Sequence, residues 1–206
     1  MRATKPILPL TALTLTALTL TATLLLSACL GGGKVPPVLM SLATDAPASA
    51  DMARSAGAGE TVTVDDPVTP KALKSLRVPA QVGDTAIAYI KDAQWIDTPD
   101  HLFRQLLTET LKRTTNRVVL DPRQSSLDPG LRITGTLDRF GYDAQAGTVI
   151  VRYDAALAAT AGSRVETRRF EAREPSAGTK DDVGPALNRA ANRVAADVAK
   201  WIGNHG

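Results

Sequence analysis

Two segments of the chain repeat apolar residues at the three- and four-residue steps of an amphipathic helix. The first covers residues 98–114, where Thr98 can cap the helix and Pro99 takes its first position. Its apolar stripe consists of Leu102, Phe103, Leu106, Leu107 and Leu111. The second covers residues 182–202, with Val183, Leu187, Ala191, Val194, Val198, Trp201 and Ile202 on one side. This spacing predicts two helices, each with one buried face.

Alternating apolar and polar positions predict strands in much of the remaining chain. We expect a strand or strand pair over residues 75–95, broken at Gly83-Asp84, and an antiparallel meander over 131–143, 147–159 and 163–173. Short strands are expected at residues 38–42, 61–64 and 117–120, whereas residues 43–60, rich in Ala, Ser and Gly, are expected to form an exposed, mobile loop. The order of strands and helices is not a strict β-α-β alternation. It predicts an α+β fold, a mainly antiparallel sheet with two helices packed on one face.

The first 28 residues have the plan of a secretory signal: Arg2 and Lys5, then a Leu-, Thr- and Ala-rich apolar run, then small residues. About 20 apolar residues can also span a bilayer, so composition alone leaves a transmembrane anchor open. The segment Leu26-Ser27-Ala28-Cys29 decides between them, because it matches the lipobox of bacterial lipoproteins. We therefore predict a cleaved lipoprotein signal peptide at 1–28, with Cys29 becoming an S-diacylglyceryl, N-acyl cysteine.

The residues after the lipobox predict how the domain is held. Residues 29–37 combine three glycines with two prolines and form a flexible tether, which precedes a domain at 38–206. Position 30 is Leu rather than the Asp that commonly retains lipoproteins on the inner membrane. This favours lipid anchoring at the periplasmic face of the outer membrane over the inner membrane.

Charge and composition argue against several classes of function. The net charge of +3 includes Arg2 and Lys5; without residues 1–28 the chain carries 22 basic and 21 acidic residues, interspersed. No basic stripe for nucleic acid is evident. One cysteine and two histidines do not make a zinc cluster of the usual spacing, and no phosphate-binding glycine loop or hydrolase motif occurs. We expect no metal and no cofactor.

The acidic pairs and histidines are candidate catalytic groups, each with a simpler interpretation. Asp65-Asp66 is expected to lie in a turn, and Asp181-Asp182 at a helix N-terminus, where carboxylates are stabilised. His101 beside Asp100 is expected to be a solvated helix residue, and His205 lies near the chain end.

The arginines and aromatic residues are candidate binding groups. Arg164 and Arg168 are expected on one face of a strand and Arg169 and Arg173 on the other, which argues against a single anion site. Tyr89 and Trp95 could form an aromatic binding spot but are expected to fill the core. No catalytic residues are therefore predicted, and we expect a non-enzymatic binding or scaffolding role.

The chain resembles the ABC-type transport auxiliary lipoprotein family, which includes the PqiC-like proteins. The landmarks are the lipobox cysteine, Val78-Pro79, Tyr89 and Trp95 before the helix beginning "LFRQLLTETL", then three strands and a last helix. The segment "LMSL" and the long loop at 43–60 depart from the family pattern. The resemblance implies a non-enzymatic auxiliary component of an MCE-type ABC system that moves lipids between inner and outer membranes. It also implies an MCE-domain partner and leaves a homo-oligomer open. An envelope structural or assembly lipoprotein is the alternative.

Overall fold

The computed structural model describes residues 38–48, 53–128, 130–159 and 164–204. They belong to one compact unit, Pro36–Gly206. The strands are β1 (Val62–Val64), β2 (Arg77–Gln81), β3 (Ile87–Gln94), β4 (Val119–Leu120), β5 (Leu131–Asp143), β6 (Thr148–Ala158) and β7 (Val165–Pro175). The helices are α2 (Pro99–Thr114) and α3 (Lys180–Gly203), with short 3₁₀ turns η2 (Lys71–Leu73) and η3 (Pro122–Gln124). Residues 1–37, with the predicted signal peptide and tether, lie outside the described residues.

The long strand β5 organises the sheet. On one side it pairs antiparallel with β6, and β6 pairs antiparallel with β7, which confirms the predicted meander. On its other side β5 pairs parallel with β1 along its first part and with β2 at its end. The remaining strands are β3, antiparallel to β2, and β4, parallel to β1.

The sheet is therefore mainly antiparallel, as predicted, and it also contains short parallel pairings of β1 with β4 and β5 and of β2 with β5. The β1 and β2 strands precede helix α2 and β5 follows it, so the chain crosses the helical layer before it returns beside them. A crossover of this kind brings strands back in the same direction. The α+β class itself is confirmed.

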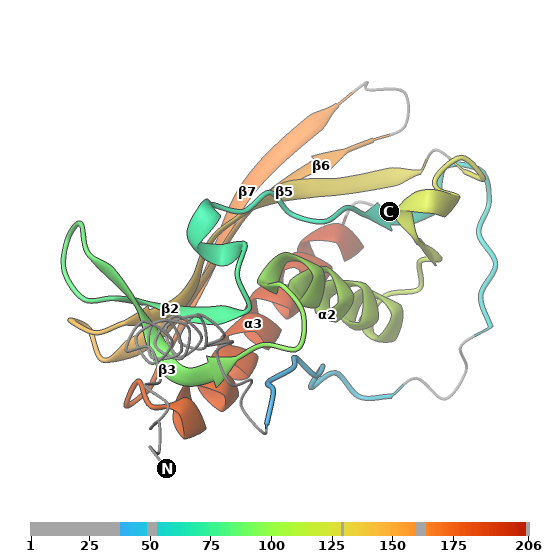
Figure 1. The fold of residues 1–206 in the computed structure, drawn as a ribbon. Helices are drawn as coiled ribbons and strands as arrows, with labels where there is room; N and C mark the ends of the chain where they lie inside the picture. Colours follow the sequence, from blue (N-terminus) through green and yellow to red (C-terminus); the bar gives the residue numbers. More distant parts are fainter. Residues whose placement is uncertain (1–37, 49–52, 129, 160–163, 205–206) are drawn as a thin grey trace, which may run out of the picture. The chain divides into compact units, whose positions relative to one another are not determined.

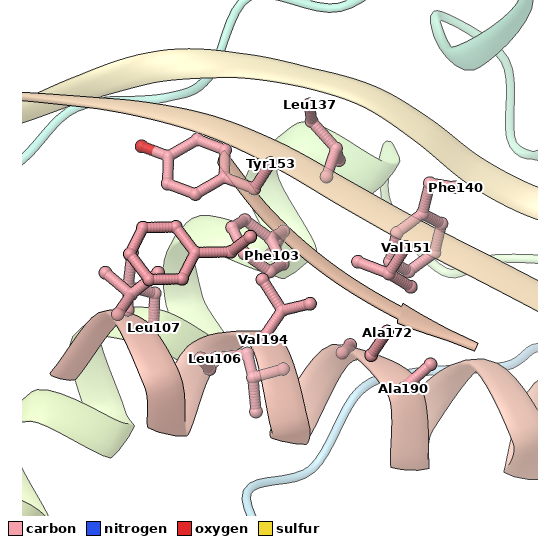
Figure 2. Close-up of a cluster of buried hydrophobic side chains, with 14 of the residues drawn as sticks. Phe103, Leu106, Leu107, Leu137, Phe140, Val151, Tyr153, Ala172, Ala190 and Val194 are labelled. Atoms are coloured by element: carbon pink, nitrogen blue, oxygen red, sulfur yellow. The ribbon is translucent and has the colours of Figure 1, made fainter. Parts of the chain in front are cut away.

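Both helices pack on the same face of the sheet, as predicted (Figure 1). Phe103 of α2 packs against Tyr153 of β6, with ring centroids 5.1 Å apart, and Trp201 of α3 packs against Phe170 of β7 at 5.6 Å. Tyr153 and Phe170 are directly opposite each other in the β6–β7 register, so their side chains share one face. Figure 2 shows this core, with Val194 of α3 beside the Phe103 ring.

The predicted helices are confirmed with small changes at their ends. Helix α2 has the predicted bounds at its start, but the Thr98 side chain makes no cap hydrogen bond. The backbone N–H of Thr98 instead donates to Oδ1 of Asp97 at 2.7 Å. Helix α3 begins two residues before the predicted start and includes Pro185 beyond its first turn, where proline cannot donate the backbone hydrogen bond of that position.

The segment at 38–46, which we call the N-terminal strap, differs from the prediction. The predicted strand at 38–42 is reduced to a single bridge between Met40 and Trp95. Residues 43–46, expected in an exposed mobile loop, are bound to both helices. Ala43 and Asp45 donate their backbone N–H groups to Asn188 (2.9 Å) and Asn192 (2.8 Å) of α3. The guanidinium of Arg113 in α2 donates to the Ala46 carbonyl at 2.9 Å.

Candidate functional site

The predicted lipidation site lies outside the described residues. This holds for Cys29 and for the lipobox residues Leu26, Ser27 and Ala28. The described chain begins at Val38, nine residues after Cys29, in the N-terminal strap beside the end of β3. Lipidation of Cys29 therefore remains a prediction. His205 also lies outside the described residues.

The acidic residues around His101 form ion pairs. His101 Nδ1 lies 3.2 Å from Asp97 Oδ1, and its Nε2 lies 3.9 Å from Asp66 Oδ2. Arg104 donates from Nε to the same Asp66 carboxylate at 2.5 Å. The His101 side chain is 47% exposed, so this is a solvated cluster on the surface of α2. Among the described residues, no group of three or more His, Cys, Asp or Glu side chains is arranged to hold a metal ion.

The carboxylates of the two predicted acidic pairs form hydrogen bonds with different partners. Asp65 receives two hydrogen bonds from Arg132, at 2.7 and 3.0 Å, while its neighbour Asp66 turns to α2. Asp182 lies in the first turn of α3, as predicted, and accepts from the Ser176 hydroxyl at 2.7 Å. This hydrogen bond lowers the pKa of Asp182, so its carboxylate stays charged at the positive end of the helix. Neither pair has the geometry of two carboxylates sharing one substrate.

The arginines of β7 occupy opposite faces of the strand, as the residue spacing predicts. Arg168 lies over the ring of Phe170 on the helix side, 5.2 Å from the centroid. Arg169 makes a bidentate pair with Asp154, at 2.6 and 2.7 Å, on the face opposite the helices. These hydrogen bonds lower the pKa of Asp154. The arginines therefore do not converge on one anion.

Glu171 continues this line of charges on the outer face, meaning the face of the sheet opposite the helices. Arg152 donates to it at 2.6 Å and also to Asp138 at 3.2 Å. Burial acts to raise the pKa of Glu171, but hydrogen bonds from Arg152 and Arg173 outweigh it and leave that pKa lowered. The result is a ladder of alternating charges across β5, β6 and β7. Such a surface is well solvated and has little net charge to attract a charged ligand.

The two aromatic candidates lie on opposite faces of the sheet. Trp95 is fully buried on the helix side and packs against Phe140, with centroids 5.5 Å apart. Tyr89 is half-buried on the outer face, donates its hydroxyl to the Ala72 carbonyl at 3.3 Å and lies 4.4 Å below the guanidinium of Arg77. The expected core role is confirmed for Trp95, whereas Tyr89 belongs to a surface that the sequence pattern did not reveal.

That surface contains an apolar hollow of about 230 Å³ on the outer face. Its lining includes Pro79, Gly141 and Ile150 of the sheet, Leu73 of η2 and Ile87 of β3. The hollow depends on Gly141, since a Cβ at that position would come within 2.4 Å of the Pro79 carbonyl oxygen. A hollow of this size can accept a small apolar group, and its lining also includes Asp138, Arg139 and Tyr142.

A larger crevice of about 810 Å³ lies at the C-terminal ends of α2 and α3. It is lined by small and polar residues, including Ala199, Gly203, Lys200 and Glu60. Arg117, also in its lining, donates to the backbone carbonyl of Glu60 at 3.2 Å.

Comparison with protein families shows to which family the chain belongs. A model of the ABC-type transport auxiliary lipoprotein component matches residues 41–199. The chain belongs to this family. The family is an auxiliary component of transport and not an enzyme family. Comparison with curated proteins finds no match.

Solved structures support the fold of this family member. Protein XCC0632 from Xanthomonas campestris superposes with a TM-score of 0.64 at 15% identity, covering 82% of this chain and 93% of that one. The crystal structure of an uncharacterized protein superposes with a TM-score of 0.60 at 17% identity, covering 71% and 94%. At these identities the likeness concerns the fold alone.

Membership of the family makes this chain an accessory lipoprotein associated with an ABC transport system. Within the part of the chain that the structure describes, no helix is both long and apolar enough to cross a bilayer. The family match begins at residue 41, twelve residues after Cys29, so it covers the folded domain and not the lipobox.

Proposed function

We propose that this chain is a lipid-anchored protein of the periplasmic face of the outer membrane and a non-enzymatic auxiliary component of an MCE-type ABC lipid transport system. The observation that carries the proposal is the order of its parts. A lipobox ending at Cys29 is followed closely by a domain of the auxiliary lipoprotein family. An enzyme of the ABC system itself would need a phosphate-binding glycine loop, which the sequence does not contain.

The proposed anchor has a clear physical role. Each buried CH₂ group contributes roughly 0.8 kcal/mol to membrane binding, and one acyl chain alone gives only marginal attachment. A diacylglyceryl group together with an N-acyl chain on Cys29 would supply three chains and hold the protein permanently. The tether at 29–37 could reach about 30 Å at full extension, enough to hold the domain beyond the lipid headgroups. Leu30, in place of Asp, supports residence at the outer membrane.

The anchor is tested by the variant Cys29→Ala. We expect it to abolish labelling with a radioactive fatty acid and to leave an uncleaved precursor, because the thiol accepts the first lipid before cleavage. The variant Ser27→Ala is the matched control, since Ala also fits the lipobox at that position, and should be processed normally. Normal processing of Cys29→Ala would show that the signal peptide is of another kind.

The transport role is tested by crosslinking the full-length, tagged protein in cells and identifying what is recovered with it. We expect an MCE-domain protein to be enriched relative to the Cys29→Ala variant, which lacks the anchor. Recovery of cell-wall or secretion components in its place would support the alternative, an envelope structural or assembly lipoprotein. No enrichment of an MCE-domain protein would count against the proposed transport system.

A further inference from the structure

Several exposed apolar side chains lie along one edge of the sheet. Among the described residues, nine large hydrophobic side chains are exposed, and six of them lie on or beside the β2–β3 hairpin. We call these six the β3 edge surface: Val38, Leu39, Leu76, Val82, Ile87 and Ile96. Ile87 is 54% exposed and Ile96 is 60% exposed. Exposed apolar residues gathered in this way mark an interaction surface.

Backbone hydrogen bonds place these residues side by side. Trp95 donates its N–H to the Leu76 carbonyl at 2.7 Å, and Ile96 donates to the Met40 carbonyl at 2.8 Å. The strap, the end of β3 and the start of β2 are therefore three neighbouring extended segments. At the other end of β3, Val82 donates to the Ala86 carbonyl at 3.0 Å, which puts Val82 next to Ile87 at the hairpin tip. From Ile87 to Ile96 the surface extends about 30 Å along the strand.

Strand β3 forms an edge of the sheet. It pairs with β2, and the strap adds one bridge at Trp95, but no other strand of the described chain pairs with it. An edge strand with exposed apolar side chains invites contact with another surface unless something covers it. Figure 1 shows the β2–β3 hairpin at one end of the sheet and η3 at the other.

The position of the tether indicates what covers this edge. Val38 is itself part of the surface and is 74% exposed, and only the nine residues 29–37 separate it from Cys29 and the end of the signal peptide. At full extension these residues reach about 30 Å, and a flexible tether is usually shorter than that. Given the lipid anchor of the proposed function, on which this inference rests, a bilayer is therefore always within reach. We propose that the β3 edge surface lies on the membrane that holds the anchor.

The charges on this edge suit a lipid surface without strong selectivity for anionic lipid. Lys74, Lys91 and Arg77 are exposed there, together with Asp84 and Asp92. Lysine and arginine can rest their alkyl stems on an apolar layer with the charged ends among the headgroups. Because acids accompany the bases, apolar contact rather than net charge provides most of the attraction. The contact should consequently change little with salt.

The test uses single-cysteine labels on the lipidated protein in vesicles of phosphatidylethanolamine and phosphatidylglycerol. Cys29 is the only cysteine of the chain, and in the proposed lipoprotein its thiol is blocked by the diacylglyceryl group, so an introduced cysteine takes the label alone. Ile87→Cys and Ile96→Cys place a polarity-sensitive fluorophore on the proposed surface. Leu127→Cys and Val165→Cys are the matched controls, because Leu127 (75% exposed) and Val165 (62%) lie near the far end of β5. That strand of 13 residues puts them about 40 Å from Ile87, because Gln81 pairs both with Ile87 and with Asp143 at the other end of β5.

Quenching by lipids with brominated acyl chains measures contact with the membrane. We expect the labels at positions 87 and 96 to be quenched about twofold or more relative to those at 127 and 165, at low and at high salt alike. Equal quenching at all four positions, with the protein still bound to vesicles, would overturn this inference and leave the anchor intact. Absence of every variant from the vesicles would overturn the anchor and the inference together. Shielding of positions 87 and 96 only after addition of envelope proteins would assign the surface to a protein partner and overturn the membrane contact.

Discussion

The N-terminal strap should depend on a single amide side chain, that of Asn192 in the middle of α3. Its Oδ1 accepts from the Asp45 N–H at 2.8 Å, and its Nδ2 donates to the Ala43 carbonyl at 2.8 Å and to the Asn188 carbonyl at 2.9 Å. Two of these three hydrogen bonds hold the strap. Replacing Asn192 with Ala removes both and leaves the helix backbone in place.

The expected loss of stability follows from these contacts. Two hydrogen bonds at about 1 kcal/mol each amount to about 2 kcal/mol. Alanine recovers part of this, about 0.5 kcal/mol, because it has the higher helix propensity. We therefore expect Asn192→Ala to lower the free energy of unfolding by about 1.5 kcal/mol, and Tm by about 3–6 °C for a domain of this size.

The matched control is Asn188→Ala, one turn earlier on α3. Asn188 accepts a single hydrogen bond from the strap, from the Ala43 N–H at 2.9 Å, so its loss of about 1 kcal/mol, less the gain in helix propensity, should lower the free energy of unfolding by only about 0.5 kcal/mol. Urea unfolding followed by circular dichroism measures both variants, and hydrogen exchange of residues 38–48 reports whether the strap is released. Equal stabilities of the two variants, or unchanged exchange in Asn192→Ala, would refute the assignment of the strap to Asn192.

Two further predictions concern the sheet and the start of α3. Gly141→Ala should lower the free energy of unfolding by about 1–3 kcal/mol, because the added Cβ would lie 2.4 Å from the Pro79 carbonyl oxygen. In the control Gly83→Ala the nearest atom is 3.7 Å from the added Cβ, so stability should change little. Equal free energies of unfolding for the two variants in urea would contradict this. The hydrogen bond from the Ser176 hydroxyl lowers the pKa of Asp182 in the folded state. The Asp182 carboxylate therefore stabilises the fold fully above its ordinary pKa of 3.8, and this stabilisation is lost as the pH falls through the lower, folded pKa. Asp182→Asn should therefore be less stable than the natural chain at neutral pH and should lose less of its stability on acidification; parallel pH profiles of the two proteins would exclude this role.

The spacing of apolar residues predicted the helices and strands that have one buried face. The stripe from Leu102 to Leu111 gives α2 because each of these side chains is needed to fill the space under the sheet. The alternation along β6 gives a strand for the same reason: Val149, Val151 and Tyr153 are buried on the helix side. Where one face of an element is fully buried, the pattern of apolar residues and the structure must agree.

Pairings between distant segments could not be predicted in this way. The parallel alignment of β1 with β5 joins residues near 62 to residues near 131, and nothing in either segment specifies the direction of its partner. The strap was missed because Ala43 and Asp45 are held through their backbone, so their side chains carry no signal. Asn192 was the available clue, since an amide in the apolar stripe of a helix must find partners when it is buried.

The strap connects the proposed anchor to the proposed membrane-contacting surface. Residues 38–40 contribute Val38 and Leu39 to the β3 edge surface, and Met40 is held to β3 by two hydrogen bonds of 2.8 Å to the backbone of Gln94 and Ile96. The strap then continues to Asn192 on α3. A force on the tether would therefore act first on the hydrogen bonds of Met40 beside β3 and then on the hydrogen bond between Asp45 and Asn192 of α3. If the strap were loose, the tether would lengthen by the released residues and β3 would lose its fixed distance from the lipid. Under the proposed anchoring and membrane contact, a firmly bound strap would keep the same edge of the sheet next to the membrane.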